Sequence, residues 1–103
     1  MKKARIIIAG GRDFDDYNRL KIVVENFIKN NKLSDIEIVS GTAKGADALG
    51  EKFAREKEYM LSFFSAEWDK YGKSAGYRRN LKMGQFADFL VAFWDGRSKG
   101  QST

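Results

Sequence analysis

Short apolar runs alternate along the chain with longer segments in which apolar residues recur at helical spacing. The runs are residues 5–10 (RIIIAG), 36–40 (IEIVS), 59–64 (YMLSFF) and 89–94 (FLVAFW). A short apolar run that turn residues bound is typical of a strand buried on both faces. The pattern therefore predicts four strands.

The segment between the first two runs predicts an amphipathic helix, because its apolar residues recur three and four positions apart. They are Leu20, Val23, Val24, Phe27 and Ile28. Asp15 or Asp16 is the predicted N-cap, since its side chain can accept hydrogen bonds from free N–H groups of the first turn. Asn30 and Asn31 are predicted to end the helix, because asparagine tolerates the left-handed conformation.

Two further helices are predicted, one starting near Ala46 and one over residues 74–86. The apolar positions of the first share a face and are Ala46, Leu49, Phe53 and Ala54. Those of the second do not share one face, so they define its bounds poorly; they are Tyr77, Leu81, Met83 and Phe86.

Strands that alternate with helices predict parallel βαβ units with right-handed crossovers. The expected fold class is therefore α/β, a three-layer sandwich with a mainly parallel sheet of about four strands. A chain of 103 residues is long enough for one core, so residues 1–103 are expected to form a single domain.

Composition excludes several classes of function. The chain has no cysteine and no histidine, which removes disulfides, thiolate zinc sites, thiol nucleophiles and the Ser-His-Asp triad. The lack of cysteine fits a reducing compartment, and we expect a cytoplasmic protein. No apolar run approaches the ~18 residues of a membrane span, and the run after "MKKAR" is too short for a signal peptide.

The net charge is +5, with a local basic patch in "YGKSAGYRRNLK" that contains Lys73, Arg78, Arg79 and Lys82. Aromatic residues are interspersed with these cations and precede them in the chain; they are Phe63, Phe64, Trp68, Tyr71 and Tyr77. Aromatic faces could stack a nucleic-acid base while the cations hold phosphates. The alternative is that the aromatics belong to the core and to loop packing, and that the cations are solvated.

Three loops are expected at the carboxyl edge of the sheet, where ligands of such sheets bind. They are "GGRDF" after the first strand, "GTAKGAD" after the second and "DGRSKG" after the fourth. In the first loop, Gly10 and Gly11 form a glycine corner, and Arg12 could act as a fork for a phosphate or carboxylate. The alternative is a simple turn whose Arg12 faces water.

The second loop joins a strand to a helix between Gly41 and Gly45. Glycines let backbone approach a ligand closely, and the free N–H groups of the following helix favour an anion such as phosphate. Lys44 adds a positive charge. An equally good interpretation is a tight turn in which Asp47 helps the helix to start. The adjacent pair Asp15–Asp16 is explained by capping, so no metal and no cofactor is expected.

The motifs "GGRDF", "SGTAKGAD", "AEWDKYGKSAGYRRNLKM" and "FWDGRSKG", in this order, resemble the YspA-like branch of the SLOG superfamily. That superfamily is related to the DprA proteins and to the Lonely-guy phosphoribohydrolases. The resemblance covers Arg5 to Gly100 and implies a Rossmann-like fold that binds a nucleotide or a nucleotide-derived ligand. The residues that it assigns to the site are Gly11, Arg12, Gly41, Gly45, Asp47, Arg79, Asn80, Gly96 and Gly100.

The chain departs from this pattern in its last motif. "DGRSKGQST" lacks the glutamate of the Lonely-guy PGGxGTxxE motif, and the chain ends where a further helix and strand are expected. A C-terminally truncated sheet would leave apolar surface uncovered, so we expect a homodimer or a higher oligomer.

The function predicted from the sequence is binding of a nucleotide-derived small molecule at the carboxyl edge of the sheet. One alternative is a phosphoribohydrolase-like enzyme, for which Asp47, Asp69 and Asp95 are the acids available in loops. The other is DprA-like binding of single-stranded DNA. Replacing Gly45 with valine is expected to abolish ligand binding and to leave the fold intact.

Overall fold

In a computed structural model of the protein, which describes residues 3–93, four parallel strands form one sheet with the order β3-β2-β1-β4. The strands are β1 (Ala4–Gly10), β2 (Ile36–Ser40), β3 (Met60–Phe63) and β4 (Phe89–Phe93). The helices are α1 (Tyr17–Asn30), α2 (Ala46–Lys57), α3 (Trp68–Tyr71) and α4 (Ala75–Phe86), with a 3₁₀ turn η1 (Gly72–Ser74). The predicted α/β fold is confirmed.

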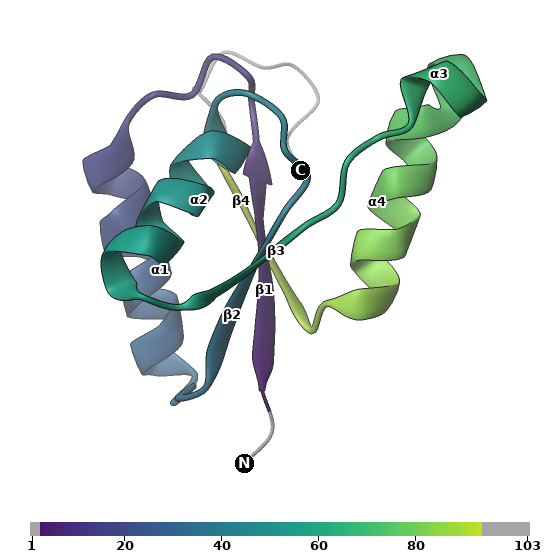
Figure 1. Ribbon diagram of the computed structural model, residues 1–103. Coiled ribbons are helices and arrows are strands. Elements are labelled where there is room, and N and C mark those ends of the chain that lie inside the picture. The colour runs from purple at the N-terminus through teal and green to yellow at the C-terminus, as the bar shows by residue number, and fades with distance from the viewer. Residues whose placement is uncertain (1–2, 94–103) are drawn as a thin grey trace.

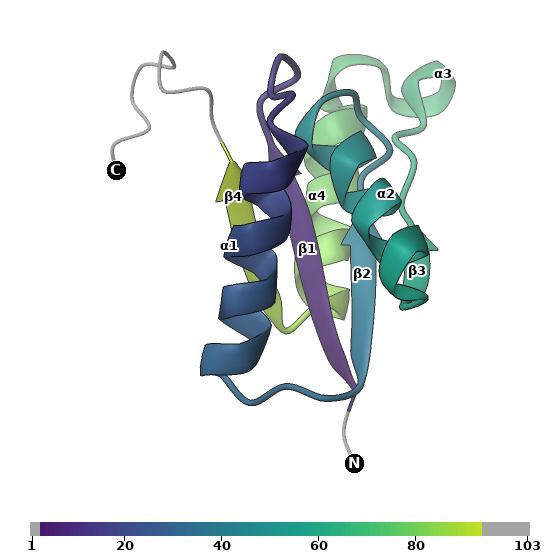
Figure 2. The same ribbon diagram turned by 90° about the vertical axis from the view of Figure 1, so that its left-hand side faces the viewer.

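The sheet is the middle of three layers. Helices α1 and α2 lie side by side on one face, and α4 lies on the other (Figures 1 and 2). Seen from the side of α1 and α2, α4 lies behind β1 and β2, and no described helix lies behind β4 (Figure 2). The α4 face of the sheet is therefore only partly covered.

The hydrophobic core divides unequally between the two faces. Under α1 and α2, the fully buried side chains include Ile6, Ile8, Leu20 and Phe53. The second cluster lies under α4 and consists of Ile7, Val39 and Met83. Parallel sheets are normally covered by helices on both faces, so the thin second cluster reflects the single helix on its side.

The ends of the helices follow from local capping, with one difference from the sequence interpretation. Asp16 caps α1, since its Oδ1 accepts a hydrogen bond from the Arg19 N–H at 3.1 Å. Asn31 follows the last residue of α1 but has a φ of −98°, whereas Lys32 has the positive φ of 54°. The left-handed residue after α1 is therefore Lys32. The backbone N–H of Asn31 donates to carbonyl oxygens of the last turn of α1.

Between β3 and α4 the chain forms two short helical turns, α3 and η1, for which no element was predicted. The side chain of Arg78 lies 4.2 Å from the centre of the Tyr71 ring, and this cation–π contact fixes part of the segment to α4. None of the helices in residues 3–93 is long and apolar enough to cross a membrane.

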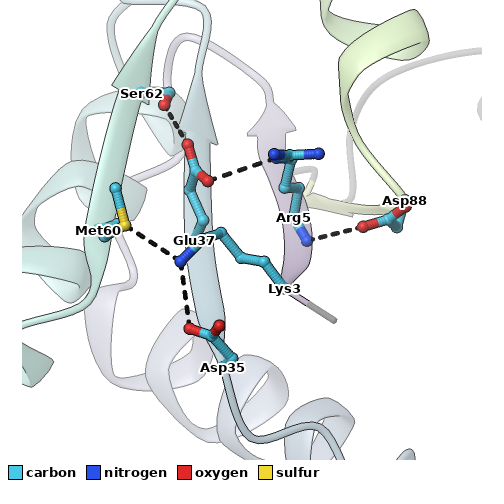
Figure 3. Close-up of polar contacts among 7 residues, drawn as sticks. All are labelled: Lys3, Arg5, Asp35, Glu37, Met60, Ser62 and Asp88. Carbon is cyan, nitrogen blue, oxygen red and sulfur yellow. Dashed lines mark hydrogen bonds and ion pairs between the residues drawn. The ribbon is translucent and has the colours of Figure 1, made fainter. Parts of the chain in front are cut away.

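A polar cluster crosses the amino ends of the strands (Figure 3). The buried carboxylate of Glu37 lies between Arg5, whose Nε is 3.4 Å away, and the hydroxyl of Ser62, which donates a hydrogen bond to it. The backbone N–H of Arg5 donates to Asp88 at 3.0 Å. These contacts link β1 to β2, β3 and the start of β4, at the end of the sheet away from the glycine loops.

Candidate functional site

A cavity of about 620 Å³ opens between β1, β4 and α4. In the strand order β3-β2-β1-β4, the chain crosses from one edge of the sheet to the other after β3, so β1 and β4 flank the topological switch point. Ligands of open α/β sheets bind at the carboxyl ends of the strands at such a point. At that end the cavity is lined by Gly10, Arg12, Ala43, Asp47, Arg79 and Asn80.

The first glycine corner closes tightly on β4. Gly10 has a φ of 151°, and a Cβ at this position would lie 1.8 Å from the carbonyl oxygen of Phe93. The N–H of Gly11 donates to the same carbonyl at 2.9 Å. Only glycine fits between the two strands at this point, because any side chain would displace β4.

The second corner packs directly on the first. Gly45 has a φ of 75°, and a Cβ here would lie 2.2 Å from the carbonyl oxygen of Gly11. That oxygen also accepts the N–H of Ala46, the first residue of α2, at 3.2 Å. The expectation that valine at position 45 would leave the fold intact is therefore wrong, since the two loops touch through backbone.

Gly41 belongs to a network with Asp47 and Arg79. Arg79 reaches from α4 across the cavity and donates from Nη1 to the carbonyl oxygen of Gly41. Asp47 in the first turn of α2 accepts a hydrogen bond from the N–H of Ala43 at 3.3 Å. A Cβ at Gly41 would lie 2.9 Å from the Asp47 carboxylate and 3.3 Å from Arg79. The network therefore holds the loop after β2 in one conformation.

Burial raises the pKa of the Asp47 carboxyl, which is only 6% exposed. The hydrogen bond from Ala43 and the positive charge of Arg79 oppose this effect and do not cancel it. An acid with a raised pKa in a cavity is a common property of functional sites.

The raised pKa of Asp47 predicts a pH dependence of stability. Below that pKa the folded state binds a proton that the unfolded chain does not hold until a lower pH, so this group adds stability as pH falls through its raised pKa. Relative to Asp47→Asn, which does not titrate, the wild type should gain free energy of unfolding between pH 7 and mildly acidic pH.

Denaturant titrations at several pH values measure this gain. Asp13→Asn, which removes an exposed carboxylate at the same edge of the sheet, controls for the change in net charge. A constant difference between wild type and Asp47→Asn across this range would contradict the assignment.

The structure brings together only some of the candidate residues. Arg12 and Asn80 line the cavity, and the Asn80 side chain accepts a hydrogen bond from Arg79 Nε at 2.9 Å. Lys44 is exposed and does not line the cavity. Asp69 lies on α3, exposed and outside the cavity lining. Gly96, Gly100 and Asp95 lie outside the described residues.

The sequence interpretation missed the lower part of the cavity. This part is apolar except for Asp88, and its apolar lining consists of Ile7, Ala9, Met83, Gly84, Ala87, Phe89, Leu90 and Ala92. In the structure, half-buried and exposed residues alternate along β4, but the run FLVAFW is apolar throughout, so the sequence carries no signal of an exposed face.

Comparison with known proteins supports the assignment that the glycine corners suggest. A profile of the YspA, cpYpsA-related SLOG family matches residues 4–71, about two thirds of the chain. The chain belongs to this SLOG family. The match includes both glycine corners and confirms the family resemblance; it covers the motifs GGRDF and SGTAKGAD in full, whereas most of the third motif and all of the fourth lie beyond it.

A gene 61 protein of Mycobacterium phage D29 is 29% identical to this chain over an aligned length of 102 residues. The alignment covers 93% of this chain and 81% of the phage protein. No solved structure matches this chain. Membership of the SLOG family indicates a role in nucleotide-related binding or processing in general.

Proposed function

We propose that the protein binds a nucleotide or a nucleotide-derived small molecule at the carboxyl end of the cavity. The observation that carries the proposal is the cavity at the topological switch point, lined by Arg12 and Arg79, in a protein of the SLOG family. Two guanidinium groups beside a glycine loop suit phosphate oxygens, which accept charge-assisted hydrogen bonds from arginine.

The start of α2 supports an anionic ligand. Its N-cap, Gly45, offers no capping side chain, and helix N-termini favour negative charge through free N–H groups and the helix dipole. The hydrogen bond from Ala46 to Gly11 occupies one of these N–H groups. The phosphate is therefore expected to lie mainly against the two arginines.

The neighbouring surface suits the rest of such a ligand. Ala9 and Ala92 pair in register one residue below Gly10, and both line the cavity. Small apolar side chains leave a flat surface on which a base or ribose can lie, while Asn80 at the rim offers an amide for hydrogen bonds. Ligand pockets combine apolar walls with a few polar groups in this way.

A thermal-shift screen against nucleoside monophosphates, nucleoside diphosphates and ADP-ribose tests the proposal. A ligand that binds only the folded state adds about 2.7 kcal/mol at a hundredfold excess over its dissociation constant, so a clear rise in melting temperature is expected. If no member of the panel shifts the melting temperature, the proposed function is wrong.

The phosphoribohydrolase alternative keeps one supporting observation, the buried Asp47 beside the proposed phosphate position. Of the three acids considered from the sequence, Asp47 alone is seen to line the cavity within residues 3–93. Incubating the protein with a nucleoside monophosphate distinguishes the two functions. Release of free base and ribose 5-phosphate that Asp47→Asn abolishes would identify an enzyme, and binding without release would identify a binding protein.

A further inference from the structure

We propose that the α4 side of the sheet is an interface between two copies of this chain. The interface is centred on Tyr77, Leu81, Gly84 and Leu90, which we call the α4–β4 patch. Three of these side chains are large and exposed, at 69% for Tyr77, 49% for Leu81 and 62% for Leu90.

The four residues of the α4–β4 patch are neighbours. Tyr77, Leu81 and Gly84 are spaced four and three positions apart on α4, which places them on one side of the helix. Gly84 and Leu90 line the same cavity. The patch therefore runs from the outer face of α4 down to the uncovered surface of β4.

The sheet requires something to cover β4 on this side. Parallel sheets are buried on both faces, and within residues 3–93 the α4 face carries a helix only over β1 and β2 (Figure 2). The side chain of Leu90 on β4 is therefore exposed on this face, where a partner can cover it.

Gly84 indicates that the covering element is a closely packed backbone. A glycine inside a helix costs about 1 kcal/mol relative to alanine, and a Cβ at position 84 would meet no atom within 4 Å. Packing within the described chain therefore does not require this glycine. A second helix that crosses α4 at Gly84 would require it.

The charge distribution favours a second copy as this partner. The two exposed cations of α4, Arg78 and Lys82, lie on its other flank, where they line a small hollow with Phe64 and Tyr71. Between them and the cavity, the outer side of α4 carries the uncharged Tyr77, Leu81, Gly84 and Gln85. Two copies with net charge +5 can approach through this uncharged side, whereas nucleic acid would need the cationic flank.

A two-fold arrangement would bury both the exposed apolar stripe of α4 and the uncovered face of β4 in each chain. Each copy offers an apolar helix stripe, Tyr77 and Leu81, and each copy has an uncovered apolar strand, with Leu90 at its centre. In an isologous dimer the stripe of one copy covers the strand of the other, and the reverse. The arginine end of the cavity stays at the rim of this interface.

Sedimentation analysis of the full chain at high micromolar concentration tests the inference, with twice the chain mass as the expected result. Leu90→Lys should raise the dimer dissociation constant at least tenfold. Ile22→Lys changes an equally exposed apolar residue, at 58%, on α1 at the opposite face, and should leave the dimer unchanged.

Gly84→Leu separates association from folding. The added side chain meets open space in the single chain and favours the helix, so the variant should fold at least as well as the wild type and associate at least tenfold more weakly. A monomeric wild type would overturn the proposal and show that another segment or another partner covers β4. A dimer that survives both Leu90→Lys and Gly84→Leu would also overturn it.

Discussion

Gly45→Ala is expected to destabilise the protein by about 3 kcal/mol or more, a large part of the stability of a small domain. The methyl group would lie 2.2 Å from the carbonyl oxygen of Gly11, and the backbone at position 45 has a φ of 75°. Neither the clash nor the strain can relax without separating the two loops. Chemical denaturation followed by circular dichroism measures the loss.

Gly76→Ala is the matched control, since it adds the same methyl group to a helical glycine where the new Cβ would make only an ordinary contact, 3.4 Å from Trp68. It is expected to raise the free energy of unfolding by up to about 1 kcal/mol. Equal effects of the two substitutions would show that the contact between the glycine corners does not hold the fold.

Arg79→Ala is expected to weaken binding of a nucleotide found in the screen by roughly 10–100-fold, because a hydrogen bond to a charged group contributes about 1.5–3 kcal/mol. The substitution also removes the donor to the Gly41 carbonyl and the cation beside Asp47. Isothermal titration calorimetry at a temperature where both proteins are folded measures the loss of affinity.

Arg78→Ala is the control for charge, because it removes the neighbouring cation from the same helix. Arg78 is exposed, contacts Ser74 and the Tyr71 ring, and does not line the cavity. Its removal should change affinity little. Equal losses in the two variants would mean that the ligand responds to overall charge, and the assigned position of the phosphate would then be wrong.

The order of strands and helices was predictable because each strand is a short apolar run between turn residues. The glycine corners were also predictable as positions at the carboxyl edge, since parallel strands end there together. Their physical role was not predictable. From the sequence, Gly41 and Gly45 could equally mark a ligand site or a tight turn. Only the three-dimensional contacts show that Gly45 packs on Gly11 and Gly41 on Arg79.

The role of α4 was the least predictable part, since two different surfaces share its sequence. Met83 and Phe86 pack on the sheet, while Tyr77 and Leu81 face outward. A single apolar stripe would be expected of a helix that only covers a sheet. These four residues do not share one face because two of them pack on the sheet and two are exposed on the outer side of α4.

The strand order also determines when the cavity can exist during folding. Ile7 of β1 pairs with Val39, 32 residues later, and with Leu90, 83 residues later. The free-energy cost of closing the longer loop is greater by about 0.8 kcal/mol, since each doubling of loop length adds about 0.6 kcal/mol. Strand β4, which lines the cavity, therefore pairs at the greatest entropic cost, and it lies at an edge of the sheet. A chain whose β4 has detached keeps β1, β2 and β3 in register but has no cavity, so ligand binding should be lost before the rest of the fold.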